Sequence, residues 1–132
     1  MTRQPLGARY RAYIDCLNAR DWDALGTFVD AGVVHNGRPL GLAGYRAMLA
    51  QDVAAIPDLR FEIALLVVDH AKVAARLRFD CHPAGTFLGL AVNGRRVLFH
   101  ENVFYALANG RIVEVWSVID RQEIEEALRS DA

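Results

Sequence analysis

The sequence predicts an α+β fold, in which helices pack on one face of a curved, mainly antiparallel sheet. Apolar residues recur at helical spacing in the first half of the 132-residue chain, whereas they alternate with polar residues in the second half. Two Asn-Gly pairs, at 93–94 and 109–110, are typical of tight turns between strands. The chain has no linker, repeat or low-complexity stretch, so we expect residues 1–132 to form a single domain.

Three helices and one short strand are expected in the first half. A stripe of apolar residues predicts the first helix over 5–20. Asp21 is a suitable N-cap for a short second helix, and a brief strand follows at 33–36. The third helix is expected from about 42 to 56, because Pro57 disfavours its continuation.

Strands dominate the second half until the last helix. Alternating apolar residues predict them, in chain order, at 61–68, 73–82, 96–107 and 111–119. Asp120 and Glu123 have the spacing of a capping box, and Ile124 and Leu128 give the helix that follows an apolar edge.

Composition limits the function classes. A formal net charge of −1 without clustered Lys or Arg argues against nucleic acid and anionic membranes as partners. No apolar run reaches the roughly 18 residues of a membrane helix, and the first residues lack the apolar core of a signal peptide. The two cysteines, Cys16 and Cys81, have no zinc spacing. We therefore expect a cytoplasmic protein with buried thiols.

The turn at 109–110 decides which side chains share a face of the last hairpin. With a two-residue loop, Glu101 lies opposite Val118 and Phe99 lies opposite Asp120, whereas a three-residue loop would undo this register. The shorter loop places Phe99, Glu101, Trp116 and Asp120 on one face. Two carboxylates beside a tryptophan suggest proton transfer, because burial and a neighbouring like charge raise a carboxyl pKa toward that of a general base.

Each of these residues also has a structural interpretation, which the sequence leaves open. Asp120 could be only the N-cap of the last helix, Glu101 an exposed strand residue and Trp116 part of the core. His35 and His82 each end a strand, where a histidine can act as an acid, a base or a donor, or hold the structure. The four histidines have no metal-ligand spacing, so we expect no metal site.

The motifs together resemble those of a known family. The run from His82 to Val97, HPAGTFLGLAVNGRRV, is similar to the H-x-G-x-F-x-G…G-[KR]-x-V run of SnoaL-like polyketide cyclases. Residues 110–120, GRIVEVWSVID, are similar to that family's G-[KR]-I-x-E-x-W-x-x-x-D ending. Segments 18–22 and 34–36 also fit, and the likeness extends from about Tyr10 to Leu128.

The resemblance implies an NTF2-like cone, with a cavity between the helices and the curved sheet. It implies a homodimer without metal or organic cofactor. Cyclases of this family close a ring by intramolecular aldol condensation of a polyketide ester, with an aspartate as acid and base. By motif position that aspartate is Asp120, and His35, Asn36 and His82 correspond to positions that line the cavity.

We therefore expect a cofactor-independent acid–base enzyme that acts on a small hydrophobic carbonyl compound. Asp120 would move a proton at carbon, while His35, His82 or Glu101 would hydrogen-bond the developing enolate oxygen. Substrate contacts are expected from Tyr13, Asn36, Phe99, Glu101 and Trp116.

Two further hypotheses stay open. One is isomerase, dehydratase or epoxide-hydrolase chemistry on the same scaffold, using either Arg78 with Asp80 or Glu101 with Asp120. The other is a non-catalytic domain that binds a small apolar ligand or serves in dimerisation.

Overall fold

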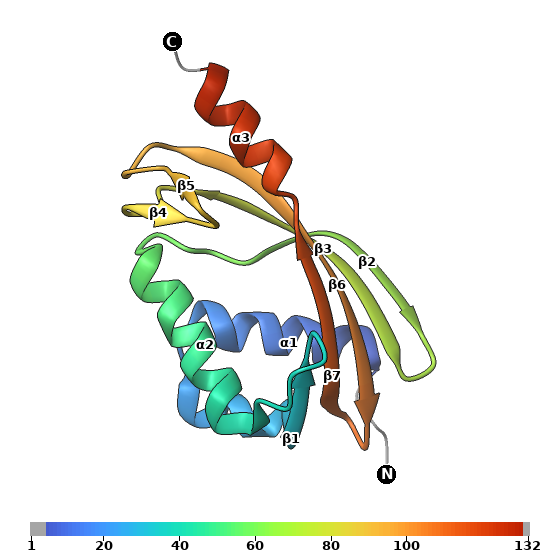
Figure 1. The fold of residues 1–132 in the computed structure, drawn as a ribbon. Helices are drawn as coiled ribbons and strands as arrows, with labels where there is room; N and C mark the ends of the chain where they lie inside the picture. The colour runs from blue at the N-terminus through green and yellow to red at the C-terminus, as the bar shows by residue number, and fades with distance from the viewer. Residues whose placement is uncertain (1–4, 131–132) are drawn as a thin grey trace.

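A computed structural model describes residues 5–130, in which helices cover one face of a curved sheet (Figure 1). The helices are α1 (Leu6–Asn18), the 3-10 helix η1 (Trp22–Thr27), α2 (Gly41–Ala55) and α3 (Arg121–Ser130). The strands are β1 (Val29–His35), β2 (Glu62–Asp69), β3 (Lys72–Cys81), β4 (Thr86–Phe87), β5 (Leu90–Ala91), β6 (Val97–Ala108) and β7 (Arg111–Ile119). Within the described residues, every helix is too short or too polar to cross a membrane.

The main sheet has the strand order β1-β7-β6-β3-β2. Neighbouring strands are antiparallel, except that β1 runs parallel to β7. α1 and α2 lie against one face of this sheet, and α3 extends away from the end of β7 (Figure 1). The α+β prediction is therefore confirmed.

Local differences from the predicted elements have simple causes. Asp21 caps the short helix as expected, since its side chain accepts a hydrogen bond from the Ala24 N–H group, but that helix is 3-10. The strand expected at 33–36 is longer, because β1 begins at Val29. The sequence analysis did not predict the small β4–β5 hairpin, because its strands of two residues each are too short for a period to be visible.

The core lies between the helices and the inward face of the sheet. Alternate residues of β3 are buried, and so are alternate residues over much of β6, while their neighbours face outward. The α1 stripe meets them from the other side. Tyr10, Tyr13, Ile14 and Leu17 of this stripe are buried. One side of the sheet is therefore dry, which allows a hollow there to shift the properties of polar groups.

A β-bulge at Val113 changes the register of the last hairpin. The pairs Ala108–Arg111 and Leu107–Ile112 confirm the predicted two-residue loop. The next partner of Ala106 is Glu114, so Val113 is an extra residue in β7.

The bulge overturns the predicted facing of β7. Beyond it Glu101 lies opposite Ile119 and not Val118, because every β7 residue after the bulge has moved by one position. Trp116 and Val118 consequently face outward, with 40% and 68% of their surface exposed. The predicted pairing of Phe99 with Asp120 is wrong for the same reason.

Two single-residue deletions test this account of the bulge. Deleting Val113 removes only the extra residue, so we expect the inward side chains to keep their places and Tm to fall by about 5 °C or less. Deleting Trp116 turns Ser117 and Ile119 outward, and we expect Tm to fall by about 10 °C or more. Thermal unfolding followed by circular dichroism measures both, and equal losses would contradict the assigned bulge.

Candidate functional site

A cavity of about 410 Å³ opens between α1, α2 and the inward face of the sheet. Its buried lining includes three tyrosines, Tyr13, Tyr45 and Tyr105. Exposed lining residues mark its mouth, and they are Asn36, Asp52, Leu88 and Arg121. A smaller hollow of about 60 Å³ is also lined by Asp52 and Glu101, and it reaches the aromatic core at Phe99.

Two carboxyl groups, from Glu101 and Asp52, face this cavity. Glu101 points inward because it alternates along β6 with buried Phe99 and Val103. Asp52 comes from α2, seven residues after Tyr45 and four before Ile56, which places it on the inner side of that helix. Strand and helix thus bring together two acids that lie 49 positions apart in the sequence.

Both carboxyl groups hold their protons more tightly than usual. Burial raises the pKa of Glu101 from 4.5 to about 7, and the negative charge of Asp52 adds to that rise. Asp52 keeps an exposed edge at the mouth, yet loss of water around its carboxyl group raises its pKa to about 6. Near neutral pH the pair therefore contains both an ionised carboxylate, which can accept a proton, and a protonated carboxyl group, which can donate one.

His35 and Ser117 form the polar wall opposite α2. The His35 Nε2 atom lies 3.2 Å from the Ser117 Oγ atom, within hydrogen-bonding distance. Burial lowers the pKa of His35, and the positive charge of Arg38 lowers it further. The imidazole is thus neutral near pH 7 and can either donate or accept a hydrogen bond.

Asn36 fixes this wall to β7 with its side chain. Its Oδ1 atom accepts a hydrogen bond of 2.8 Å from the Ser117 N–H group, and its Nδ2 atom donates one of 3.2 Å to the Ser117 carbonyl. The Asn36 N–H group donates to the Val115 carbonyl at 2.8 Å. The amide therefore lines the cavity while its recorded bonds hold the backbone.

The buried tyrosine hydroxyls are paired with one another. The hydroxyl oxygens of Tyr13 and Tyr45 lie 2.7 Å apart. Tyr10, from the adjacent turn of α1, donates its hydroxyl proton to the Tyr105 hydroxyl at 3.0 Å. Burial raises the pKa of all four side chains, so their hydroxyls are protonated and can act as donors.

The structure brings five of the predicted site residues together. Tyr13, His35, Asn36 and Glu101 line the main cavity, and Phe99 lines the small hollow beside it. Their placement agrees with a ligand site, while their individual roles stay predictions.

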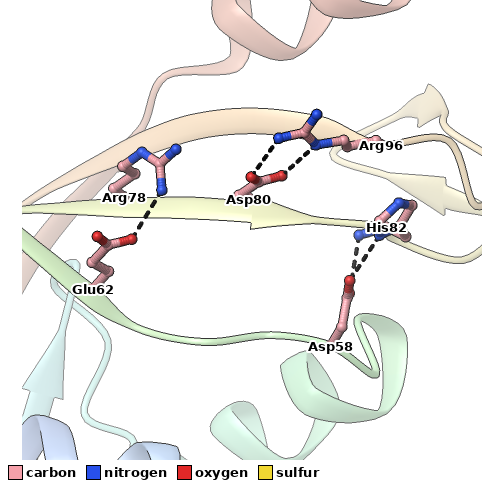
Figure 2. A network of polar contacts seen from close by, with 6 residues as sticks. All are labelled: Asp58, Glu62, Arg78, Asp80, His82 and Arg96. Atoms are coloured by element: carbon pink, nitrogen blue, oxygen red, sulfur yellow. Dashed lines mark hydrogen bonds and ion pairs between the residues drawn. The ribbon is translucent and has the colours of Figure 1, made fainter.

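His82 does not line the cavity, and 52% of its side-chain surface is exposed beside Asp58 (Figure 2). Its Nδ1 atom is 2.8 Å from the Asp58 Oδ2 atom, and its N–H group donates to Asp58 Oδ1 at 3.0 Å. These contacts join the end of β3 to the segment after α2. The expectation that His82 lines the cavity is therefore wrong, because the outward alternation of β3 carries it to the surface.

Arg78 and Asp80 do not form the pair that one alternative required. The Arg78 guanidinium binds Glu62 at 2.9 Å, while Asp80 binds the Arg96 guanidinium at 2.8 and 2.7 Å (Figure 2). All four residues lie on the outward face, so this network does not contribute to the cavity.

Trp116 and Asp120 are not among the residues that line the cavity either. Trp116 faces outward because of the bulge. Asp120 directly precedes α3, and its Oδ1 atom accepts a hydrogen bond of 3.3 Å from the Glu123 N–H group. This is the N-cap that the sequence left open as an alternative. A catalytic role for Asp120 stays a prediction, without a place in the cavity to support it.

The sequence analysis did not single out Asp52, Tyr45, Tyr105 or Ser117 as site residues. Asp52 had a signal, because it continues the inner stripe of α2 that contains Tyr45 and Leu49. Ser117 had none, since the bulge that turns it inward is not marked by glycine. Within residues 5–130, no three His, Cys, Asp or Glu side chains are arranged to hold a metal ion.

Known proteins share the sequence pattern and the architecture of this chain. A family model described as SnoaL-like polyketide cyclase matches residues 8–128. The chain is 56% identical to a SnoaL-like polyketide cyclase from Agrobacterium tumefaciens, covering 96% of this chain and 99% of that one, with a TM-score of 0.94. No curated protein matches it.

More distant structures share only the fold. TsrD from Streptomyces laurentii is 22% identical, with 97% of each chain covered and a TM-score of 0.81. IdmH from Streptomyces antibioticus is 19% identical, with 96% of this chain and 99% of that chain covered and a TM-score of 0.82. The family match and the 56% identical structure confirm the expected NTF2-like cone.

The raised pKa of Glu101 predicts a stability effect with a defined sign. Between pH 4.5 and about 7 the folded protein binds more protons at Glu101 than the unfolded chain, so the free energy of unfolding falls as pH rises. Gln cannot ionise. We expect Glu101→Gln to be more stable than the parent by about 3 kcal/mol near pH 8 and about equal below pH 4.5. Urea unfolding across this range measures it, and a difference independent of pH would contradict the burial of the carboxyl.

Proposed function

The chain belongs to the SnoaL-like polyketide cyclase family, and we propose that it is a cofactor-independent acid–base enzyme acting on a small hydrophobic carbonyl compound. The observation that carries this proposal is the pair of carboxyl groups with raised pKa, Glu101 and Asp52, facing one cavity of about 410 Å³. A general base that works near neutral pH requires such a shift. A domain that only holds an apolar ligand has no need for two carboxyl groups with raised pKa at its cavity.

The reaction starts with proton removal at the carbon next to a carbonyl group. The ionised form of Glu101 takes that proton, and the electron pair of the C–H bond moves into the enolate. The enolate carbon then attacks a second carbonyl carbon of the same molecule, which forms the new C–C bond and closes the ring. The oxygen of the second carbonyl becomes an alkoxide, and it receives the proton that Glu101 carries. Proton balance is thus kept without any other reactant.

Two neighbouring groups support this cycle. Asp52 keeps the pKa of Glu101 high through its negative charge, so that Glu101 can return the proton as readily as it takes it. Neutral His35, held beside Ser117 at 3.2 Å, offers a hydrogen bond to the enolate oxygen. Donors fixed before the reaction lower the barrier most, because they need not reorganise.

Isomerase chemistry is the second candidate. The same two carboxyl groups could move a proton from one carbon to another of an enolisable ketone, because both steps need only a base and its conjugate acid. Ring closure requires a second carbonyl within the substrate. Product analysis with mono- and dicarbonyl compounds therefore separates the two reactions.

Exchange of the methyl protons of acetophenone for deuterium tests the proposed base without knowledge of the natural substrate. We expect Glu101→Gln to slow this exchange by about 100-fold or more, because the amide cannot accept the proton. Proton NMR in deuterated buffer follows the signal. Asp120→Asn is the matched variant, and we expect it to retain exchange. A comparable loss in Asp120→Asn alone would return the role of base to that residue.

The pH dependence of the same exchange tests the coupling. The parent rate should rise with the ionisation of Glu101, around pH 7. Asp52→Asn removes the charge that raises the Glu101 pKa, so its profile should move to lower pH. An unshifted profile would show that Asp52 does not act on the base.

We also propose that the protein forms a homodimer through the outward face of the sheet. Five large apolar side chains are exposed there, and they are Leu65, Val67, Phe104, Trp116 and Val118. A patch of this kind on a folded domain is typical of an interaction surface. Its position on the side opposite to the cavity would leave the cavity mouth open in the dimer.

A charge placed in this patch tests the assembly. We expect Phe104→Glu to convert a dimer into a monomer at micromolar concentration, because its carboxylate would be buried unpaired in the interface. His70→Glu, at the exposed turn between β2 and β3, adds the same charge elsewhere and should stay dimeric. Light scattering after gel filtration measures the mass, and a monomeric parent would contradict the proposal.

A cytoplasmic location is proposed on more general grounds. Cys16 and Cys81 are free, buried thiols. Proteins of reducing compartments typically keep their cysteines in this form.

A further inference from the structure

The cavity contains more hydroxyl protons than its own hydrogen bonds use. Four tyrosines meet at the buried end and form two hydroxyl pairs, Tyr13 with Tyr45 and Tyr10 with Tyr105. A phenol has one proton, and one hydrogen bond between two phenols uses one of their two protons. Each pair therefore keeps one proton for another acceptor.

In the second pair only Tyr105 can present the spare proton to the cavity. When Tyr10 donates to the Tyr105 oxygen, as their geometry allows, the proton of Tyr105 is not used by the pair. Within residues 5–130, the structure records no acceptor for it. Tyr105 lines the cavity with only 3% of its surface exposed, while Tyr10 does not line it. A buried donor without an acceptor costs about 1–3 kcal/mol, which a ligand oxygen in the cavity would relieve.

The position of Tyr105 sets it apart from the reacting end. It follows Glu101 by four residues on the same face of β6, which corresponds to about 13 Å along a strand. Of the exposed residues at the mouth, Asp52 also lines the small hollow beside Glu101, whereas Asn36 hydrogen-bonds to Val115, the β7 partner of Tyr105. An oxygen bound by Tyr105 is therefore a different atom from the oxygen of the carbonyl that Glu101 activates.

We propose that Tyr105 determines specificity by donating a hydrogen bond to an oxygen at the buried end of the substrate. The substrate class is then an elongated, largely apolar compound with oxygen functions at both ends. Only the location of the reacting carbon beside Glu101 rests on the proposed function. The hydrogen bond from Tyr105 rests on the proton count and on the lining of the cavity.

Two probes of similar shape isolate this hydrogen bond. 1,4-Diacetylbenzene has a second carbonyl oxygen where 4-isopropylacetophenone has a methyl group. Isothermal titration calorimetry gives the Kd of each probe. The ratio of the two Kd values reports how much the second carbonyl oxygen contributes to the affinity. Relative to the parent, we expect Tyr105→Phe to reduce the preference for the diketone by about five- to tenfold.

Tyr10→Phe is the matched control. It removes the same bond between Tyr10 and Tyr105 but leaves the Tyr105 proton, so we expect the preference to stay within about twofold of the parent. Both variants lose one buried hydroxyl of one pair, and their Tm values should fall alike. An equal fall of the preference in both variants, or none in either, would overturn the proposal.

A measurement on the parent protein keeps the test independent of folding in the variants. The phenolic proton of Tyr105 should shift downfield in the NMR spectrum when 1,4-diacetylbenzene is added, and not when 4-isopropylacetophenone is added. An unmoved signal with the diketone bound would overturn the proposal. These experiments measure binding alone, so a negative result does not affect the exchange test of Glu101. In the same way, a negative exchange test does not affect the preference for the diketone, which is measured separately.

Discussion

The alternation of side chains along β6 and β7 is the constraint on which the rest of the molecule depends. A strand presents every second residue to the dry side, and the bulge at Val113 decides which residues of β7 these are. The result is an inward face with Glu101 and Ser117, and an outward face with Trp116 and Val118. One extra residue in a strand of nine thus separates the chemistry of the cavity from the apolar surface behind it.

The same dryness that stabilises the fold makes the two acids reactive. A carboxylate in water has little tendency to take a proton from carbon, whereas loss of hydration raises the pKa of Glu101 and Asp52 into the neutral range. Ionising such groups in a poorly hydrated site lowers the free energy of unfolding. The protein is therefore less stable near neutral pH than an inert core of the same size would be, which is a common price of an active site.

The elements that have a periodic sequence pattern could be predicted from the sequence. The features that depend on a single residue, such as a bulge, could not. Helical and alternating periods located the helices and the long strands, and the pattern on β6 put Glu101 and Phe99 on the same face but did not decide whether Glu101 points inward. The bulge at Val113 has no glycine to mark it, and it reversed the facing of Trp116. Asp52 was visible in principle, as a single carboxylate on the inner stripe of α2, but a helix with polar residues on several sides does not reveal which of them faces a cavity.

Asn36 shows how a side chain can take over the work of a main chain. Its amide oxygen and nitrogen meet the N–H and carbonyl groups of Ser117 as a peptide unit of a neighbouring strand would. The backbone of Asn36 itself is left-handed, with a φ of 48°, a conformation that asparagine tolerates better than most residues. Aspartate lacks the donor and alanine lacks both groups. An asparagine at this point in a relative is therefore a sign of shared architecture, and its presence says little about which molecule that relative transforms.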